Sequence, residues 1–299
     1  IDWPAAAALS AALVCLNIAL VNMSEISTVG GLEELTGRRS LPTLPFFLAA
    51  AGAFAAFLWF ERRSRDPVVD LRLFRRPNFG IAMLLNFLVG AALIIAMVDV
   101  PLFINIVVES DLERAAVLSG WVLSVLTAVM ALASWAGGRL TEASWYRPPA
   151  LAGLAAAAVA FGVMAATWSP AVGLPVMALC LALLGAGFGL VTAPSNAAAV
   201  DAVPPDRRGV AGGLVILARL MGLAVGLSGL TAWAMYRYQA ATQSPGAAYQ
   251  DPSQQALERL TSTALRETFL FSAGLLVVAF AVAWLLRRHR DDAGAAPPS

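Results

Sequence analysis

The sequence predicts an all-α polytopic membrane protein with about eight transmembrane helices, and three observations support this fold class. Hydrophobic residues make up 59% of the 299 residues and charged residues only 13%, which is too apolar for a single water-soluble core. The apolar residues form runs of ~20 residues or more, enough to cross a hydrocarbon core of ~30 Å. The arginines concentrate in alternate connections between these runs, a pattern typical of polytopic proteins.

Eight charge-poor runs are long enough to be transmembrane helices. They cover residues 4–24, 42–60, 79–107, 115–137, 149–168, 173–199, 209–235 and 267–286. Trp121, Trp168 and Trp284 fall near the ends of runs, where an indole ring favours the headgroup layer. No run pairs a basic start with a small-residue cleavage site, so we expect no signal peptide. Because the chain begins at Ile1 rather than Met, we expect further sequence upstream.

The placement of arginine predicts the orientation of the chain. The connections after the second, fourth, sixth and eighth runs hold thirteen arginines, and the alternate connections hold six. Basic residues in short connections are retained on the cytoplasmic side of the membrane. We therefore expect a multi-pass protein of the cell inner (plasma) membrane with both ends of this chain in the cytoplasm.

Two connections are longer than the others. Residues 61–78 place Asp66 and Pro67 before apolar positions set among arginines, which predicts a short amphipathic helix on the inner leaflet. Residues 237–266 are polar and contain turn-prone Pro and Gly, which predicts an external loop. The Ala- and Pro-rich end of the chain predicts a disordered tail.

Composition and spacing argue against several classes of function. A net charge of +1 gives no basic face for a nucleic-acid partner. Cys15 and Cys180 lie inside apolar runs without the spacing of metal ligands, which indicates small buried hydrophobes. The single His289 has no visible catalytic partner, and clustered carboxylates are missing too, so the sequence predicts no enzyme, no cofactor and no metal site.

Glycines in two runs are spaced for close helix packing. Gly185 and Gly189 lie four residues apart in GAGFGLVTAPSNAAAV (185–200), and Gly222 and Gly226 repeat this spacing in the next run. A phosphate-binding glycine loop would need a strand before it, and none is predicted here. Small residues at this spacing let two helix backbones approach each other within a bilayer.

Polar residues follow the first glycine pair. Pro194 removes one helical hydrogen bond, and Ser195 and Asn196 then either satisfy the freed backbone groups or face a cavity. A kink with packing and no substrate contact stays open as the alternative. Together with Asn86 in the run 79–107, these two residues are candidates for lining a substrate cavity.

Two ionisable residues lie deep inside apolar runs, where each costs about 2.5–3.5 kcal/mol on insertion scales and a function is the default hypothesis. Arg219 lies about 15 Å from the start of its run and Asp99 about 30 Å from the start of its own, so we expect no direct ion pair. Arg219 is expected near the membrane midplane. Asp99 is expected at the outer mouth of a cavity as a proton-coupling group, or alternatively at the external interface beside Pro101.

The order of these motifs resembles the C-terminal portion of the fourteen-helix drug:proton antiporter branch of the major facilitator superfamily. The segment PVVDLRLFRRPNFG (67–80) resembles the linker that precedes the second six-helix domain of that branch. The segment GGRLTE (137–142) resembles a cytoplasmic gating motif, with candidate residues Gly138, Arg139, Glu142 and Arg147. The segments GFGLVTAPSNAAAVDAVPPDRRGVAGG and ARLMGLAVG resemble helices of its last domain.

The resemblance implies four parts in this chain. Residues 1–60 would form two inserted central transmembrane helices, 61–78 a cytoplasmic amphipathic linker, 79–288 the C-terminal six-helix transporter bundle, and 289–299 a disordered tail. The N-terminal six-helix bundle of the same polypeptide would be the missing partner. The resemblance also implies proton-coupled efflux of a small amphipathic compound or drug, with protons and the lipid bilayer as further partners. A non-transporting membrane sensor or scaffold stays open as the alternative.

Overall fold

The computed structural model describes residues 7, 8, 10–12, 14, 15, 18, 43–63, 73, 76–109, 111–143, 145–169, 172–243 and 254–286. Regular structure in these residues is helical, with no strand among them. The chain divides into two compact units, residues 1–73 with 227–239 and residues 74–226 with 240–299.

The first unit contains α3, Thr43–Arg63, which corresponds to the predicted run 42–60. Its apolar stretch among the described residues is Leu48–Phe57. The described positions between residues 7 and 18 are helical, but most of the predicted run 4–24 lies outside the described residues. Asp66 and Pro67 of the predicted amphipathic linker lie outside them as well, as does the predicted tail 289–299.

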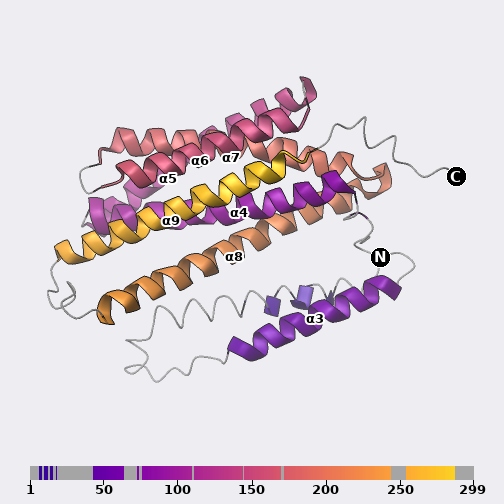
Figure 1. The fold of residues 1–299 in the computed structure, drawn as a ribbon, viewed down its shortest axis with the longest axis horizontal. Helices are drawn as coiled ribbons and strands as arrows, with labels where there is room; N and C mark the ends of the chain where they lie inside the picture. The colour runs from indigo at the N-terminus through magenta and orange to yellow at the C-terminus, as the bar shows by residue number, and fades with distance from the viewer. Residues whose placement is uncertain are drawn as a thin grey trace. The chain divides into compact units, whose positions relative to one another are not determined.

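The second unit is a helix bundle, and its helices match the last six predicted runs (Figure 1). Six segments of the described chain are long and apolar enough to cross a membrane. The elements are α4 (Pro77–Phe103), the π-helix η2 (Ile104–Val108), α5 (Leu112–Ala143), α6 (Arg147–Thr167), α7 (Leu174–Asp201), the 3-10 turn η3 (Pro205–Arg207), α8 (Arg208–Gln243) and α9 (Gln254–Ala283). Residues 227–239 of α8 belong to the first unit.

Helix α7 is central to the second unit. It packs against α5, α6 and α4, while α9 packs against α6 and α4. Figure 1 shows α5, α6 and α7 side by side, with α4 and α9 next to them. The first part of α8 lies against α4, as the glycine contacts below show.

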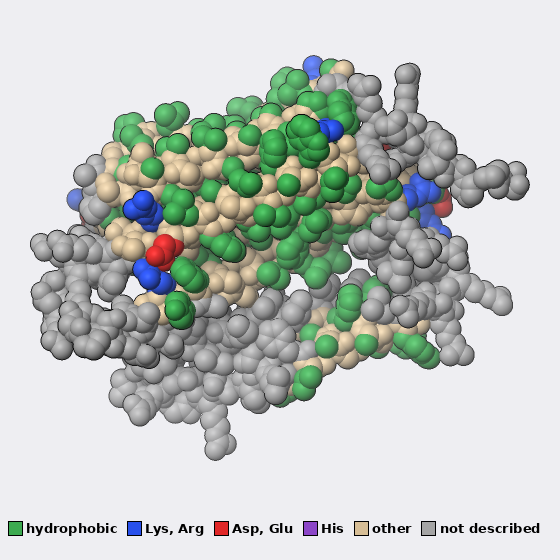
Figure 2. Space-filling model, viewed as in Figure 1, with side chains coloured by type: hydrophobic (Ala, Val, Ile, Leu, Met, Phe, Trp, Pro, Cys, Tyr) green, Lys and Arg blue, Asp and Glu red, His purple; other side chains and the backbone are tan. Residues whose placement is uncertain are grey.

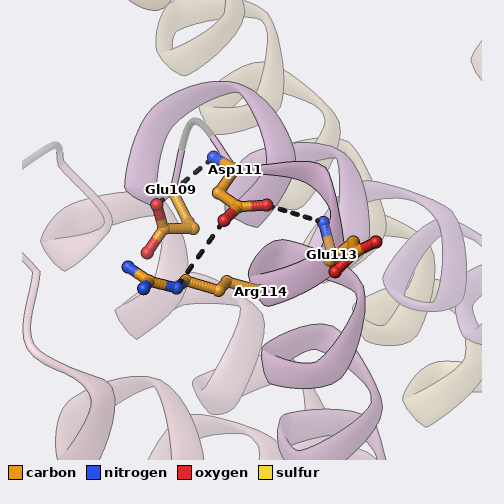
Figure 3. Close-up of polar contacts among 4 residues, drawn as sticks. All are labelled: Glu109, Asp111, Glu113 and Arg114. Atoms are coloured by element: carbon orange, nitrogen blue, oxygen red, sulfur yellow. Dashed lines mark hydrogen bonds and ion pairs between the residues drawn. The ribbon is translucent and has the colours of Figure 1, made fainter.

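The sequence contains start signals for most of these helices. Pro77, Pro148 and Pro175 stand in the first turns of α4, α6 and α7, where the missing N–H group costs nothing and the fixed φ favours a helix. At the start of α5, the backbone N–H of Glu113 donates to Asp111 Oδ1 at 3.0 Å (Figure 3), which is an N-cap. The ion pair of Asp111 with Arg114 is exposed and adds little stability.

Glycines bring helix backbones together at two contacts. A Cβ atom added at Gly185 would meet the backbone of Leu126 in α5, and one at Gly189 would meet the backbone of Met130. On α8, Gly222 lies in the same way against Phe87 of α4. Gly226 completes the second contact, because a Cβ atom added there would lie 2.6 Å from the carbonyl oxygen of Ala91 in α4.

Aromatic rings fill the core where α4, α6, α7 and α9 meet. Trp168 packs on Phe103 and Phe269, with ring centroids 4.9 and 5.3 Å apart. Phe161 joins this cluster through Phe269 at 6.0 Å, and it also packs on Phe188 at 6.4 Å. Most of these rings are fully buried, so the cluster anchors four helices to one another.

Two expectations differ from the structure. Trp168 stands at the end of α6 as predicted, but the residue is only 7% exposed because the chain turns there and the ring packs inward instead of toward headgroups.

The polar region 237–266 is not one long loop, since α8 continues to Gln243 and α9 begins at Gln254. Its residues are mostly good helix formers, and a search for charge-poor runs does not detect a helix that extends past its apolar part. The 36 residues of α8 measure about 54 Å, well beyond the ~30 Å hydrocarbon core.

The surface of the bundle is apolar along its length. Figure 2 shows hydrophobic side chains over the described helices and charged side chains gathered toward the helix ends. The most exposed large hydrophobic residues include Trp121, Leu132 and Trp135 on α5 and Leu179 on α7. A water-soluble protein rarely exposes such a surface, whereas a lipid-facing surface requires it.

A methyl group at Gly185 should destabilise the bundle. The Gly185→Ala variant is expected to lose about 1–3 kcal/mol of unfolding free energy because the new Cβ overpacks the backbone of Leu126. Gly162→Ala on α6 is the matched control, since nothing lies within 4 Å of that Cβ position and alanine favours a helix over glycine by about 1 kcal/mol. Thermal unfolding in detergent measures both. Equal melting temperatures for the two variants would contradict the close packing of α5 and α7.

Candidate functional site

Four of the five predicted cavity residues lie in one polar network, which we call the Arg219 network: Asn86 on α4, Ser195 and Asn196 on α7, and Arg219 on α8. Arg219 Nη2 donates to Asn86 Oδ1 at 2.6 Å and to Asn196 Oδ1 at 3.3 Å. Asn86 Nδ2 donates to Ser195 Oγ at 3.3 Å and to the carbonyl oxygen of Ala82 at 3.0 Å. Side-chain hydrogen bonds therefore connect three helices, α4, α7 and α8.

Close contact of α4 with α8 positions this network. A Cβ atom at Gly90 would meet the carbonyl group of Arg219, and one at Gly222 would meet that of Phe87. Only a residue without a side chain fits between two backbones at such contacts. The Arg219 side chain leaves α8 directly beside α4, where it reaches Asn86, one turn before Gly90.

Pro194 shapes the α7 side of the network. It lies inside α7, so one backbone donor is missing there. The Ser195 hydroxyl donates to the carbonyl oxygen of Thr192 at 3.0 Å and accepts from Asn86. Ser195 thus bonds a backbone carbonyl group and joins the network at once, and its contact with a substrate stays a prediction.

The charge of Arg219 is held by neutral groups. Its hydrogen-bond partners are amide oxygens, and in the part of the chain that the structure describes it forms no ion pair. Its Nε atom is buried and has no hydrogen-bond partner. Amide oxygens satisfy part of the N–H donor set and leave the positive charge uncompensated.

Asp99 is separate from the Arg219 network. It lies 13 residues after Asn86 on α4, which is about 20 Å along the helix, and it faces α9. Thr268 Oγ1 lies 2.5 Å from Asp99 Oδ2, and the two residues are 1% and 6% exposed. The structure therefore encloses Asp99 between helices, which differs from the expected position at an open mouth or at the interface beside Pro101. The helix does not break at Pro101 but continues into η2.

The residues of the predicted gating motif do not form one cluster. Nothing lies within 4 Å of a Cβ position at Gly138, and Arg139 lies over the ring of Trp135 at 4.7 Å. Glu142 is exposed. Arg147 instead stacks over the ring of Trp284 at 3.7 Å, which joins the start of α6 to the end of α9.

The sequence reasoning missed several polar contacts. Near the Arg147 stacking, Tyr146 donates to Asp201 Oδ2 at 2.7 Å, and Arg76 Nη1 donates to the carbonyl oxygen of Ala202 at 2.7 Å. Thr268 was missed as the partner of Asp99. Its spacing to Ser272, four residues later within an apolar run, was an available signal, because buried hydroxyl groups at helical spacing mark a polar stripe.

The described residues offer little for a metal. They contain no group of three or more His, Cys, Asp or Glu side chains that could hold a metal ion. Cys180 is buried and unpaired by disulfide, and Cys15 is half-buried.

Comparison with known proteins identifies the family. Residues 2–227 match the sequence model described as Major Facilitator Superfamily. The chain belongs to this superfamily. It is therefore a multi-pass membrane protein of a family of transporters and not of enzymes.

Similar proteins occur among mycobacteria. The chain is 31% identical over 297 residues to a triacylglyceride transporter of Mycolicibacterium hassiacum, covering 90% of this chain and 54% of the relative. It is 33% identical over 274 residues to one of Mycolicibacterium smegmatis, covering 85% and 48%. It is 30% identical over 242 residues to one of Mycobacterium tuberculosis, covering 77% and 46%. The chain thus spans about half the length of these relatives.

Solved structures show the same fold. A bacterial homologue of the human lysosomal transporter Spinster, in inward-facing unoccupied and occupied conformations, superposes with a TM-score of 0.53 at 18% identity. The superposition covers 95% of this chain and 69% and 66% of the two structures. At this identity the likeness concerns the fold alone. The relatives named above are not described as drug:proton antiporters, so the branch indicated by the sequence motifs stays a proposal.

Replacing Asn86 should destabilise the bundle through Arg219. In Asn86→Ala, Arg219 Nη2 keeps only the longer bond to Asn196, and an unsatisfied buried donor costs about 1–3 kcal/mol. Asn105→Ala is the matched control, because Asn105 lies on the same helical segment but is exposed. Thermal unfolding in detergent should show a lower melting temperature for the Asn86 variant alone. A melting temperature equal to that of the control would mean that the network contributes no net stability.

Proposed function

We propose that this chain is the C-terminal part of a proton-driven secondary transporter that exports lipid-like amphipathic molecules across the bacterial inner membrane. The Arg219 network is the observation that carries the proposal. It combines a positive charge, three neutral hydrogen-bonding side chains and a surrounding apolar bundle. A purely structural bundle has no need for such a charge, because an intramembrane arginine is costly to insert.

The network suits a substrate with acceptor oxygens. Arg219 presents N–H donors, and the ester or carboxyl oxygens of a lipid are acceptors only. The relatives named as triacylglyceride transporters support this substrate class, since they are 30–33% identical over most of this chain. Small amphipathic drugs are the narrower alternative that the resemblance to drug:proton antiporters suggests.

The proposed transporter contains more than this chain. We propose that α3 and the apolar run before it are two inserted central helices of a fourteen-helix arrangement. The helices from α4 to α9 form one bundle, and a second six-helix bundle of the same polypeptide faces it. Transport then proceeds by rocking of the two bundles around a site near the midplane. The thirteen arginines in the connections after the second, fourth, sixth and eighth runs support a cytoplasmic position for both ends of this chain.

Transport by reconstituted protein tests this proposal. The protein is produced as its gene encodes it and placed in vesicles with an imposed pH gradient, and movement of a fluorescent triacylglyceride is compared with movement of an amphipathic dye. We expect gradient-dependent movement of the lipid. In Arg219→Ala, loss of charge-assisted hydrogen bonds worth about 1.5–3 kcal/mol should slow transport on the order of 10- to 100-fold.

Two control variants sharpen the test. Arg219→Lys keeps the charge but presents a single ammonium in place of the planar donor set, so intermediate transport is expected. Arg114→Ala removes an exposed arginine of α5 and should leave transport unchanged. Movement of the dye alone would favour drug export. Correctly inserted protein that moves neither compound would favour a sensor or scaffold. Full transport activity of Arg219→Ala would show that Arg219 does not bind the substrate.

A further inference from the structure

Three oxygen atoms lie in a row between α4 and α9. Thr268 Oγ1 is 2.5 Å from Asp99 Oδ2 and 2.9 Å from the carbonyl oxygen of Leu265. The surroundings of this row are apolar, with Val100, Phe103 and Phe269 all buried. Asp99 is the only titratable residue in α4 and η2, so the site contains one acid enclosed by two helices.

No described positive group compensates Asp99. The helices around Asp99 contain few titratable side chains. Those of α5 lie only near its two ends, and α8 has Arg219 nearest α4. The others nearest Asp99 are Arg147 on α6, Cys180 and Asp201 on α7, and Arg266 and Glu267 beside Thr268 on α9. Arg147 stacks on Trp284, Asp201 accepts from Tyr146, and Arg219 binds amides. Within the described part of the chain, Asp99 forms no ion pair.

The number of protons available at these contacts favours a neutral Asp99. A threonine hydroxyl has one proton, yet Thr268 Oγ1 lies between two oxygens. If Asp99 were ionised, both oxygens would be acceptors and one contact would have no proton. If Asp99 is protonated, it donates to Thr268 Oγ1, and the hydroxyl donates to the carbonyl oxygen of Leu265. Every oxygen contact then holds one proton, and no unpaired charge is buried.

We propose that Asp99 and Thr268 form a proton-holding site, in which Asp99 is the neutral acid while α4 and α9 are in contact. Separation of the two helices would admit water, the Oδ2–H bond would break, and the proton would pass to a water molecule. Water would then solvate the carboxylate, which the closed contact does not. This deepens the proposed proton-driven transport, on which its functional part rests.

Thr268 is a positioning residue in this site. Its hydroxyl directs the acid proton and connects it to the backbone of α9, and it does not itself gain or lose a proton overall. Thr268→Ser keeps the hydroxyl, whereas Thr268→Val keeps the shape and removes it. Ser272→Ala is the matched control, because Ser272 is equally buried one turn later and bonds only to the carbonyl oxygen of Thr268.

Infrared difference spectroscopy of the reconstituted, gene-encoded protein tests the charge state without any transport. The spectrum of the parent minus that of Asp99→Asn at neutral pH should contain the C=O stretch of a protonated carboxylic acid. This band should shift in Thr268→Val, return to its place in Thr268→Ser and stay unchanged in Ser272→Ala. A carboxylate band in its place would overturn the proton-holding site, even if the protein transports lipid.

Transport measurements then test coupling. Asp99→Asn should abolish accumulation driven by a pH gradient while fluorescent lipid still exchanges between the two sides without a gradient. Gradient-driven accumulation by this variant at the parent's rate would show that Asp99 holds a proton without coupling it to transport. A parent protein that moves no lipid or dye would refute the proposed function, and the infrared result would still decide the charge state of Asp99.

Discussion

The contact of α4 with α8 is the constraint on which the polar interior depends. Gly90 lies against the carbonyl group of Arg219, and Gly222 lies against that of Phe87. In a bilayer, apolar side chains do not drive helices together as they do in water, so packing at small residues and interhelical hydrogen bonds must hold them. The same short distance that requires glycine lets Arg219 reach Asn86. A larger residue at Gly90 would therefore disturb packing and the network together.

The two intramembrane ionisable groups of the bundle, Arg219 and Asp99, differ in their charge state and in their hydrogen-bond partners. Arg219 keeps its charge, because guanidinium groups stay protonated in proteins, and amide oxygens from two helices satisfy part of its donor set. Asp99 can instead be protonated, and the hydrogen bonds of its single hydroxyl partner, Thr268, favour the neutral acid over the carboxylate. In the proposed transporter, the first site would offer a permanent charge to an incoming acceptor, and the second would become charged only when water enters.

Much of the fold and part of the site could be predicted from sequence. Charge-poor length predicts helices, and unusual residues within such a run, such as Arg219 or Asn196, are visible because the bilayer penalises them. The partner of a buried group is harder to predict, because Thr268 differs little from any other hydroxyl residue until α9 lies against α4. Trp168 shows the same limit, since its position in the chain resembles an interface residue and only tertiary packing turns the ring inward.

Helix α4 connects the two polar sites. Asn86 and Asp99 are on one helix, about 20 Å apart, and the proline in the interior of this helix, Pro101, comes after both. The segment between them is an uninterrupted helix and behaves as a stiff rod, since the usual causes of a sharp kink are absent from its described backbone. A movement of α4 away from α9 at Asp99 therefore also acts on the contact with α8 at Asn86. In the proposed transporter, proton release at one depth of the membrane would in this way change the environment of the Arg219 network at another.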